Sequence, residues 1–207
     1  MKISNTDSTK FLGVNIDSNL NWKNHIANVT KKVNSGILVL CQTTQSLSKK
    51  ENILVYNAFI QSFLSYGIIL WGGSEGNISI LNKIFRKQKK AVRIISKIYD
   101  SKVSCRGLFK KHGILTLTCL YVYFAAIYAM KNISTSTCAS IHKYDTRNKN
   151  NIFKEQYVKG QVKWNCTQIF DKLPKYIKSQ NDMLKFKKVL KKYLIERECY
   201  TLSEFVD

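Results

Sequence analysis

The chain has 207 residues, of which 44% are hydrophobic and 12% aromatic, so it can bury a core and is not a broadly disordered protein. Its 34 lysines and arginines against 13 acidic residues give a net charge of +21, and a polyanion, either nucleic acid or an anionic membrane surface, is the first partner to consider. One proline and nine glycines argue against a turn-rich all-β fold. We therefore predict a mainly α fold with at most a few short strands.

The first predicted element is a strand. Phe11 to Asp17 reads FLGVNID, and the alternation of its apolar residues predicts one short, half-buried strand. A single strand cannot form a sheet, so we expect it to be poorly paired or to pair only locally. From Asn21 onward, apolar residues recur at steps of three and four, which predicts a helix.

A long helix is predicted from Ser48 to about Trp71. The run SKKE at its start, Ser48 to Glu51, is a capping box, and Gly72 with Gly73 ends the pattern. Apolar residues occupy most of the circumference, so we expect this to be the central and most buried helix.

Asn77 to Lys97 predicts a helix with two different faces. On a helical wheel its apolar residues fall within about 140° of one another. Seven cations and no acidic residue occupy the opposite arc. They are Lys83, Arg86, Lys87, Lys89, Lys90, Arg93 and Lys97.

This basic face has two interpretations. It could be a solvated surface, but such faces usually mix signs and gain from pairs of opposite charge. A face of cations alone repels itself unless a polyanion lies against it. We therefore take the seven cations as the candidate nucleic-acid-binding residues, with largely sequence-independent contacts to the phosphates.

The remaining elements are helical. We predict a short helix from Ser104 to Gly113, capped by Ser104, and a buried helix from Leu117 to Asn132. Residues 114–130 carry no charge, and a membrane helix is the alternative to a core helix here. The composition of residues 134–151 indicates a loop.

Two more helices are predicted beyond the loop, Trp164 to Leu173 and Met183 to Glu196, with Pro174 between them. The last helix carries a second lysine face. We consider it a weaker candidate because Asp182, Glu196, Glu198 and Glu204 surround it in the sequence.

No catalytic or metal centre is predicted. The aspartates are isolated, and so are the three histidines, whereas two-metal phosphoryl transfer needs clustered carboxylates. His25 is expected to be structural, satisfied by a neighbouring backbone group. The six cysteines form no CxxC pair and lie at no zinc-finger spacing from a histidine, so we expect buried thiols in a reducing compartment and no cofactor. The polar start, Met1 to Lys10, predicts no secretory signal, and an intracellular location, nucleus or cytoplasm, follows.

Several runs of residues together resemble one family. The chain is similar to the region just past the catalytic palm in reverse transcriptases of non-LTR, LINE-type retrotransposons, particularly the jockey-like group of these transposable elements. The likeness covers nearly the whole chain, in order and at the family's spacing. The matching runs are KFLGVNIDSNLNWKNHI (10–26), LSYGIILWG (64–72), QKKAVRIIS (88–96), SCRGLFKKHGILTL (104–117), YDTRNKNNI (144–152) and FDKLPKYIK (170–178).

The resemblance implies a thumb-like helical bundle that grips the template–primer duplex of an RNA-directed DNA polymerase. It divides the chain into a residual strand and lead-in from a palm domain (1–20), a helical thumb-like domain (21–132), a linker (133–151) and a C-terminal helical extension (152–207). The family's Mg²⁺-binding aspartates would lie upstream of Met1, so we expect a non-catalytic fragment whose partners are the RNA and DNA backbone and the missing palm domain. The alternatives are a membrane-associated basic protein using residues 114–130, and a basic scaffold domain adopted by the host.

Overall fold

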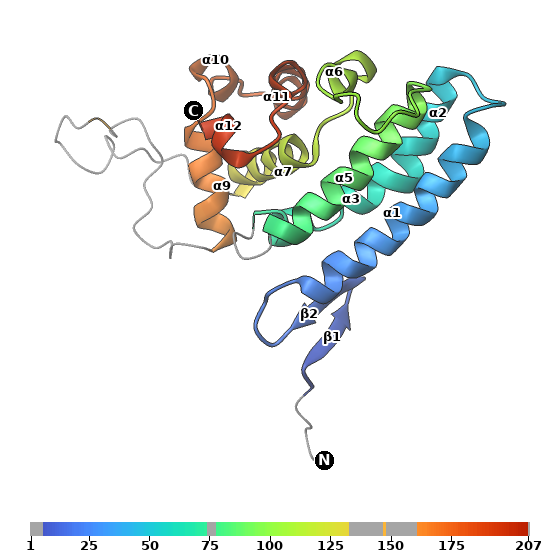
Figure 1. Cartoon of the computed structure of the whole chain (residues 1–207). Coiled ribbons are helices and arrows are strands. Elements are labelled where there is room, and N and C mark those ends of the chain that lie inside the picture. Colours follow the sequence, from blue (N-terminus) through green and yellow to red (C-terminus); the bar gives the residue numbers. More distant parts are fainter. Residues whose placement is uncertain (1–5, 74–77, 133–146, 148–160, 207) are drawn as a thin grey trace.

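The structure is a computed structural model that describes residues 6–73, 78–132, 147 and 161–206 (Figure 1). It is mainly helical, which confirms the predicted fold class. The elements are β1 (Ser8–Phe11), β2 (Val14–Asp17), α1 (Lys23–Thr43), α2 (Lys49–Tyr56), the π-helical turn η1 (Asn57–Gln61), α3 (Ser62–Ser65), α4 (Ile68–Trp71), α5 (Ile78–Ile95), α6 (Leu108–His112), α7 (Leu117–Asn132), α9 (Val162–Asp171), α10 (Lys175–Lys178), α11 (Met183–Arg197) and α12 (Leu202–Val206).

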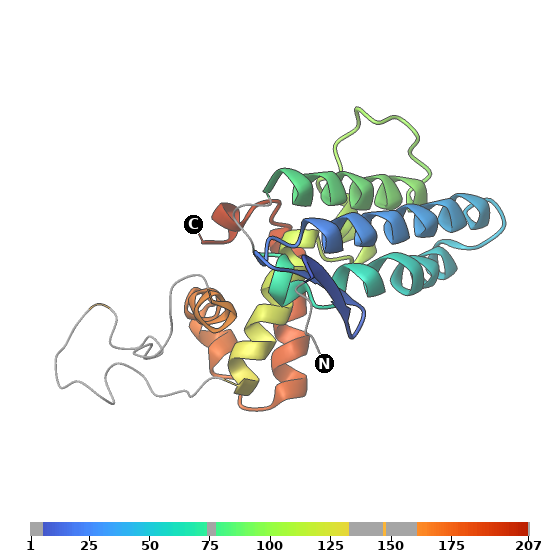
Figure 2. The ribbon, with the colours of Figure 1, turned by 90° about the horizontal axis from the view of Figure 1, so that it is seen from below.

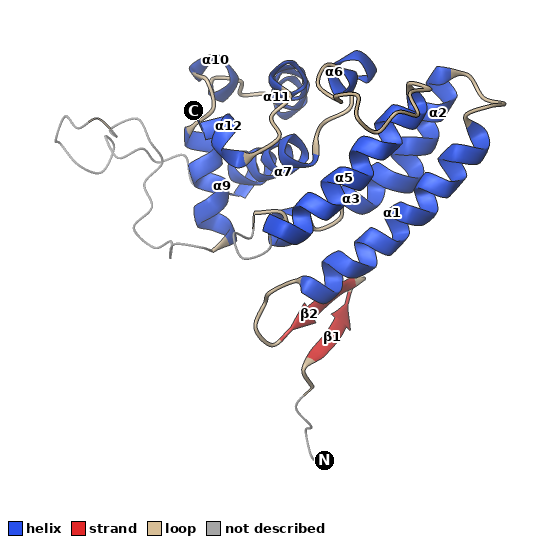
Figure 3. Cartoon of the chain, in the orientation of Figure 1, coloured by secondary structure: helices blue, strands red, loops and turns tan. Residues whose placement is uncertain are grey.

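The predicted single strand is in fact a hairpin, so this prediction was wrong in its strand count. β1 and β2 pair antiparallel, with Ser8 opposite Asp17 and Phe11 opposite Val14. The two residues between them, Leu12 (φ 45°) and Gly13 (φ 81°), have the positive φ angles of a tight hairpin turn, which reverses the chain inside the run taken as one strand. The expectation of purely local pairing is confirmed, since these two strands form the whole sheet within the described residues (Figure 3).

The start of α1 is fixed by the end of the hairpin. Both carboxylate oxygens of Asp17 accept backbone N–H groups, from Asn21 at 2.9 Å and from Trp22 at 2.9 Å. These bonds hold the two residues that precede α1 against the end of the hairpin. The predicted helix from Asn21 onward is confirmed, and its apolar stripe is buried.

The segment from Ser48 to Trp71 begins as predicted but is not one straight helix. The capping box is present, with the Ser48 N–H donating to Glu51 Oε2 at 2.6 Å. The helix widens into η1, ends at Ser65, and resumes as α4 after Gly67 at φ 61°. The prediction that this is the most buried helix was wrong, because Leu54 and Phe59 are 67% and 46% exposed and α7 buries more of its residues.

Helices α1, α5 and the α2–α3 segment lie side by side, and α7, α9 and α11 form a second group (Figures 1 and 2). α1 approaches η1 closely at Gly36, where a Cβ would collide with the carbonyl oxygen of Phe59. One apolar core runs through both groups. Its largest fully buried side chains include Trp71, Tyr56 and Phe109.

The uncharged segment 114–130 belongs to this core, as its core-helix interpretation predicts. Ile114, Leu120 and Ala125 are each 2% exposed or less. α7 packs against α9 on one side and α11 on another. Within the described part of the chain, no helix combines the length and apolarity that crossing a membrane requires.

The remaining predicted helices are present with shifted ends, and the structure adds α10 and α12, which were not predicted. α6 starts at Leu108, after Gly107 at φ 82°, and not at Ser104, whose hydroxyl instead accepts the N–H of Arg106 at 3.2 Å. It ends at Gly113 as predicted. α9 and α11 are confirmed, and Pro174 separates α9 from α10. Apart from Arg147, the predicted linker 133–151 lies outside the described residues.

Candidate nucleic-acid interface

α5 packs on three sides and exposes a narrow strip. It contacts α1 and α2 and, further along, α6. The apolar positions of its inner arc, such as Ile84, Ala91 and Val92, are fully buried. Because neighbours cover both edges of that arc, the seven cations do not share one environment.

Five of the seven predicted cations form a row, which we call the α5 basic row: Lys83, Arg86, Lys87, Lys90 and Lys97. Lys83, Arg86 and Lys90 are exposed along the helix, and Lys97 is exposed just beyond its end. At 1.5 Å per residue, Lys83 and Lys90 are about 10 Å apart along the helix axis. Lys87 and Lys90 also line a small hollow of about 170 Å³ between α5 and α1.

The other two cations make internal contacts. Arg93 donates from Nε and Nη2 to the carbonyl oxygen of Val103, at 3.0 and 2.9 Å. The Lys89 ammonium lies 4.8 Å from the ring centre of Phe85 and 5.4 Å from that of Tyr200. Both side chains therefore hold neighbouring segments against α5, and their charges are less free for an external phosphate.

Sequence reasoning missed a polar residue on the inner side of α5. Gln88 is fully buried, and its Nε2 donates to the hydroxyl of Tyr56 and to the carbonyl oxygen of Leu115, both at 2.9 Å. Burial raises the pKa of the Tyr56 hydroxyl well above its usual range. The available signal was spacing, since Gln88 lies four residues from both Ile84 and Val92 on the apolar face.

The α5 basic row has no acidic counterpart. Among the described residues the ion pairs are Arg106 with Glu204, at 2.8 Å, and Lys110 with Glu196, and neither involves α5. Asp100, the acidic residue nearest in sequence, accepts the N–H of Lys102 at 2.8 Å. The positive potential along the row is therefore not neutralised from within the described structure.

The acidic residues around α11 are engaged inside the protein. Asp182 caps α11 by accepting the N–H groups of Leu184 and Lys185. Glu196 pairs with Lys110, Glu198 accepts the N–H of Gly107 at 2.6 Å, and Glu204 pairs with Arg106. These contacts leave exposed lysines on the outer face of α11: Lys185, Lys188, Lys191 and Lys192.

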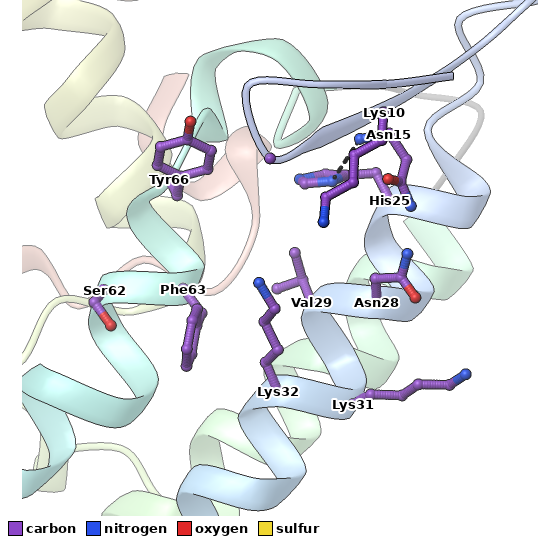
Figure 4. Close-up of a pocket in the computed structure, with 11 residues that line it drawn as sticks. Lys10, Asn15, His25, Asn28, Val29, Lys31, Lys32, Ser62, Phe63 and Tyr66 are labelled. Carbon is purple, nitrogen blue, oxygen red and sulfur yellow. Dashed lines mark hydrogen bonds between the residues drawn. The ribbon is translucent and has the colours of Figure 1, made fainter. Parts of the chain in front are cut away.

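A second basic feature lies between the hairpin, α1 and α3. This hairpin pocket has a volume of about 710 Å³, and its lining includes Lys10, Lys31, Lys32, His25 and Phe63 (Figure 4). The Lys32 ammonium lies 5.0 Å from the ring centre of Phe63. Among the described residues, no aspartate or glutamate lines the pocket.

His25 lies in the core and one of its ring nitrogens bonds a backbone group, as the sequence predicts, whereas its Nε2 has no hydrogen-bond partner among the described residues. It is 4% exposed, and its Nδ1 accepts the backbone N–H of Asn15 at 3.4 Å, so the neutral ring carries its proton on Nε2. The ring lies edge-on against Trp71, with centroids 5.9 Å apart. Burial, and then the charge of Lys32, lower the pKa of His25.

The cysteines in the described part of the chain differ in their burial. No cluster of three His, Cys, Asp or Glu side chains there has the arrangement to hold a metal ion. Cys105, Cys119, Cys166 and Cys199 are buried as predicted, and Cys41 is exposed, contrary to the prediction. Burial raises the pKa of Cys166 to about 12, so this thiol stays protonated near pH 7.

Comparison of the chain with protein-family models, with curated proteins and with solved structures finds no match.

Proposed function

We propose that this protein binds the sugar–phosphate backbone of nucleic acid through the α5 basic row. The observation that carries the proposal is a line of cations along α5 and just beyond its end, all exposed except the half-buried Lys87. None of them has an ion pair to a carboxylate among the described residues. Such a line attracts a polyanion through contacts to phosphate oxygens, which carry no sequence information. Binding is therefore largely independent of sequence.

The resemblance of the chain to the thumb region of non-LTR retrotransposon reverse transcriptases supports the same proposal. A helical bundle that presents a basic helix suits the task of holding a template–primer duplex. In this interpretation the chain is a non-catalytic fragment of an RNA-directed DNA polymerase, and a palm domain and the nucleic acid are its partners inside the cell. A basic scaffold domain adopted by the host would use the same helix in the same way.

Salt dependence of binding tests the proposal. With four or five phosphates neutralised, the logarithm of the association constant for duplex DNA should fall with the logarithm of salt concentration with a slope of about −4. We expect equal slopes for two duplexes of unrelated sequence, measured by fluorescence anisotropy. A flat salt response, or binding to one sequence alone, would reject the proposal.

Absence of polymerase activity is a separate part of the proposal. Nucleotide addition needs two metal ions held by closely placed carboxylates, and the acidic residues here are spread along the chain. The purified protein should bind a primed RNA template and leave the primer unextended with Mg²⁺ or Mn²⁺ and all four nucleotides. Extension that disappears when one acidic residue is replaced would contradict this part.

The same protein preparation tests the membrane alternative. We expect it to stay in the supernatant when neutral liposomes are sedimented at 150 mM salt, since its uncharged segment 114–130 is packed in the core. Retention on neutral liposomes would favour the alternative, because their attraction cannot come from the basic surface.

A further inference from the structure

The hairpin pocket differs from the α5 basic row in shape, and its shape favours a different ligand. The row is an open line of charges on one helix. The pocket is a hollow of about 710 Å³ bounded by three elements, and this volume is within the range of small-molecule sites. A hollow of this kind suits a compact ligand or the end of a chain better than the middle of a long strand.

Cations from two separate elements converge on the pocket. Lys10 comes from β1 and Lys32 from α1, and Figure 4 shows their ammonium ends extending toward the same space. Lys31, which also lines the pocket, extends away from that space in the same view. The contact with the Phe63 ring, 5.0 Å from the Lys32 ammonium, favours the orientation of Lys32 along the wall.

Nothing on the pocket wall neutralises this charge. The lining contains no carboxylate, and neither ion pair of the described residues includes Lys10 or Lys32. The charge of Lys32 also acts on His25, whose lowered pKa keeps that ring neutral near pH 7. Two uncompensated cations in a concave site focus a positive potential and raise the local concentration of anions.

The charge of the ligand separates two kinds of phosphate. A phosphate monoester carries a charge of about −1.5 to −2 near pH 7, whereas each backbone diester carries only one negative charge. Paired cations in a hollow favour the more highly charged group.

We propose that the hairpin pocket binds a phosphate monoester of nucleotide size, with Lys10 and Lys32 on either side of the phosphoryl group. The monoester is either a free nucleotide or the terminal phosphate of a strand. The site is distinct from the α5 basic row and does not depend on it.

Calorimetric titration of the full chain tests the proposal, with 5′-AMP, adenosine and inorganic phosphate as probes. We expect 5′-AMP to bind at least tenfold more tightly than adenosine. The double variant Lys10→Gln/Lys32→Gln should lose at least tenfold in 5′-AMP affinity. Lys23→Gln removes a charge from α1, the helix that carries Lys32, at a position outside the pocket. This control should change the 5′-AMP affinity less than twofold. Equal binding of 5′-AMP and adenosine, or an unchanged affinity in the double variant, would overturn the proposal.

Two further measurements identify the source and separate this site from the row. Displacement of 5′-AMP by a 5′-phosphorylated oligonucleotide assigns a strand end, and failure of that oligonucleotide to displace 5′-AMP assigns a free nucleotide. Equal displacement by a 5′-hydroxyl oligonucleotide would show that diesters suffice and would overturn the proposal.

Charge reversal of Lys87 and Lys90 should leave 5′-AMP affinity unchanged while it weakens duplex binding. Binding at the hairpin pocket and binding at the α5 basic row can therefore be lost independently. The imidazole proton signals of His25 should shift with 5′-AMP in the wild-type chain and not in the double variant.

Discussion

Helices α5 and α11 are both lysine-rich, but their acidic neighbours differ. Nothing acidic lies within α5, whereas Asp182, Glu196 and Glu198 are at or near the ends of α11. In the structure this contrast largely disappears at the surface, because those carboxylates bind α6, the turn before it and the N-terminus of α11 itself. Acidic residues close in sequence therefore need not neutralise a basic face, since their side chains can be committed to contacts elsewhere.

The largest expected effect comes from charge reversal on α5. Lys87→Glu/Lys90→Glu should weaken duplex binding about 60-fold at 0.1 M salt, since each lost phosphate contact costs close to a factor of eight under those conditions. Fluorescence anisotropy on two unrelated duplexes measures it. The matched control on α11, Lys188→Glu/Lys192→Glu, changes net charge equally and should cost less than tenfold. Equal losses would show that both helices contact the nucleic acid.

The second effect concerns the buried side of α5. Gln88→Leu leaves the Tyr56 hydroxyl and the Leu115 carbonyl without this partner in the core, and it should lower the free energy of unfolding by about 2–3 kcal/mol. Arg86→Gln on the exposed side should change it by less than about 0.5 kcal/mol. Urea denaturation measures both, and a neutral result for Gln88→Leu would show that another group satisfies these atoms.

The third effect tests whether the C-terminal carboxylates stabilise the fold through contacts inside the protein. Glu198→Ala removes the acceptor for the Gly107 N–H and should cost about 2 kcal/mol of unfolding free energy. Glu196→Ala breaks only an exposed pair with Lys110 and should cost less than about 1 kcal/mol. The test is the difference between the two variants in their loss of unfolding free energy. Similar small losses for both variants would mean that Glu198 is no more important than a surface charge.

The smallest effect at neutral pH is a pH dependence of the free energy of unfolding. It comes from two buried histidines, His25 in α1 and His112 in α6. Burial lowers the pKa of His25 and of His112, so below about pH 6.5 the unfolded chain binds more protons than the folded one. The free energy of unfolding should therefore fall as pH drops below 6.5, by at most about 1.4 kcal/mol per pH unit for each histidine. Urea titrations between pH 7 and 5 should show a shallower decline in His25→Gln/His112→Gln. Identical slopes would assign the decline to other groups.

Periodicity and end signals predicted much of the fold. The extents of α7 and α11, the capping box at Ser48 and the stop at Gly113 all follow from local spacing and terminal residues. The hairpin turn could not be predicted in this way, because a leucine at a positive φ angle, such as Leu12, has no sequence signature. Composition also gave no means of deciding that Leu54 and Phe59 face outward.

The candidate site was predictable only as a set of cations. Their division into a free row and two engaged residues depends on partners that are distant in sequence or belong to a separate loop. Lys89 meets Tyr200 from the C-terminal segment, and Arg93 meets the carbonyl of Val103. The hairpin pocket likewise joins Lys10 and Lys32 to Phe63, which local patterns could not bring together.

The contacts between the start of α7 and the C-terminal segment have a consequence for synthesis on the ribosome. Thr116 and Thr118 bond to the carbonyl oxygens of Cys199 and Tyr200, 83 and 82 residues further along. At common translation rates those partners are made about 4–16 s after Thr116 and Thr118. Until α9 is made, the helices already synthesised against which α7 packs are α3 and α4. The nascent chain then has an apolar helix with its other sides uncovered, and this is the stage at which self-association competes most strongly with folding.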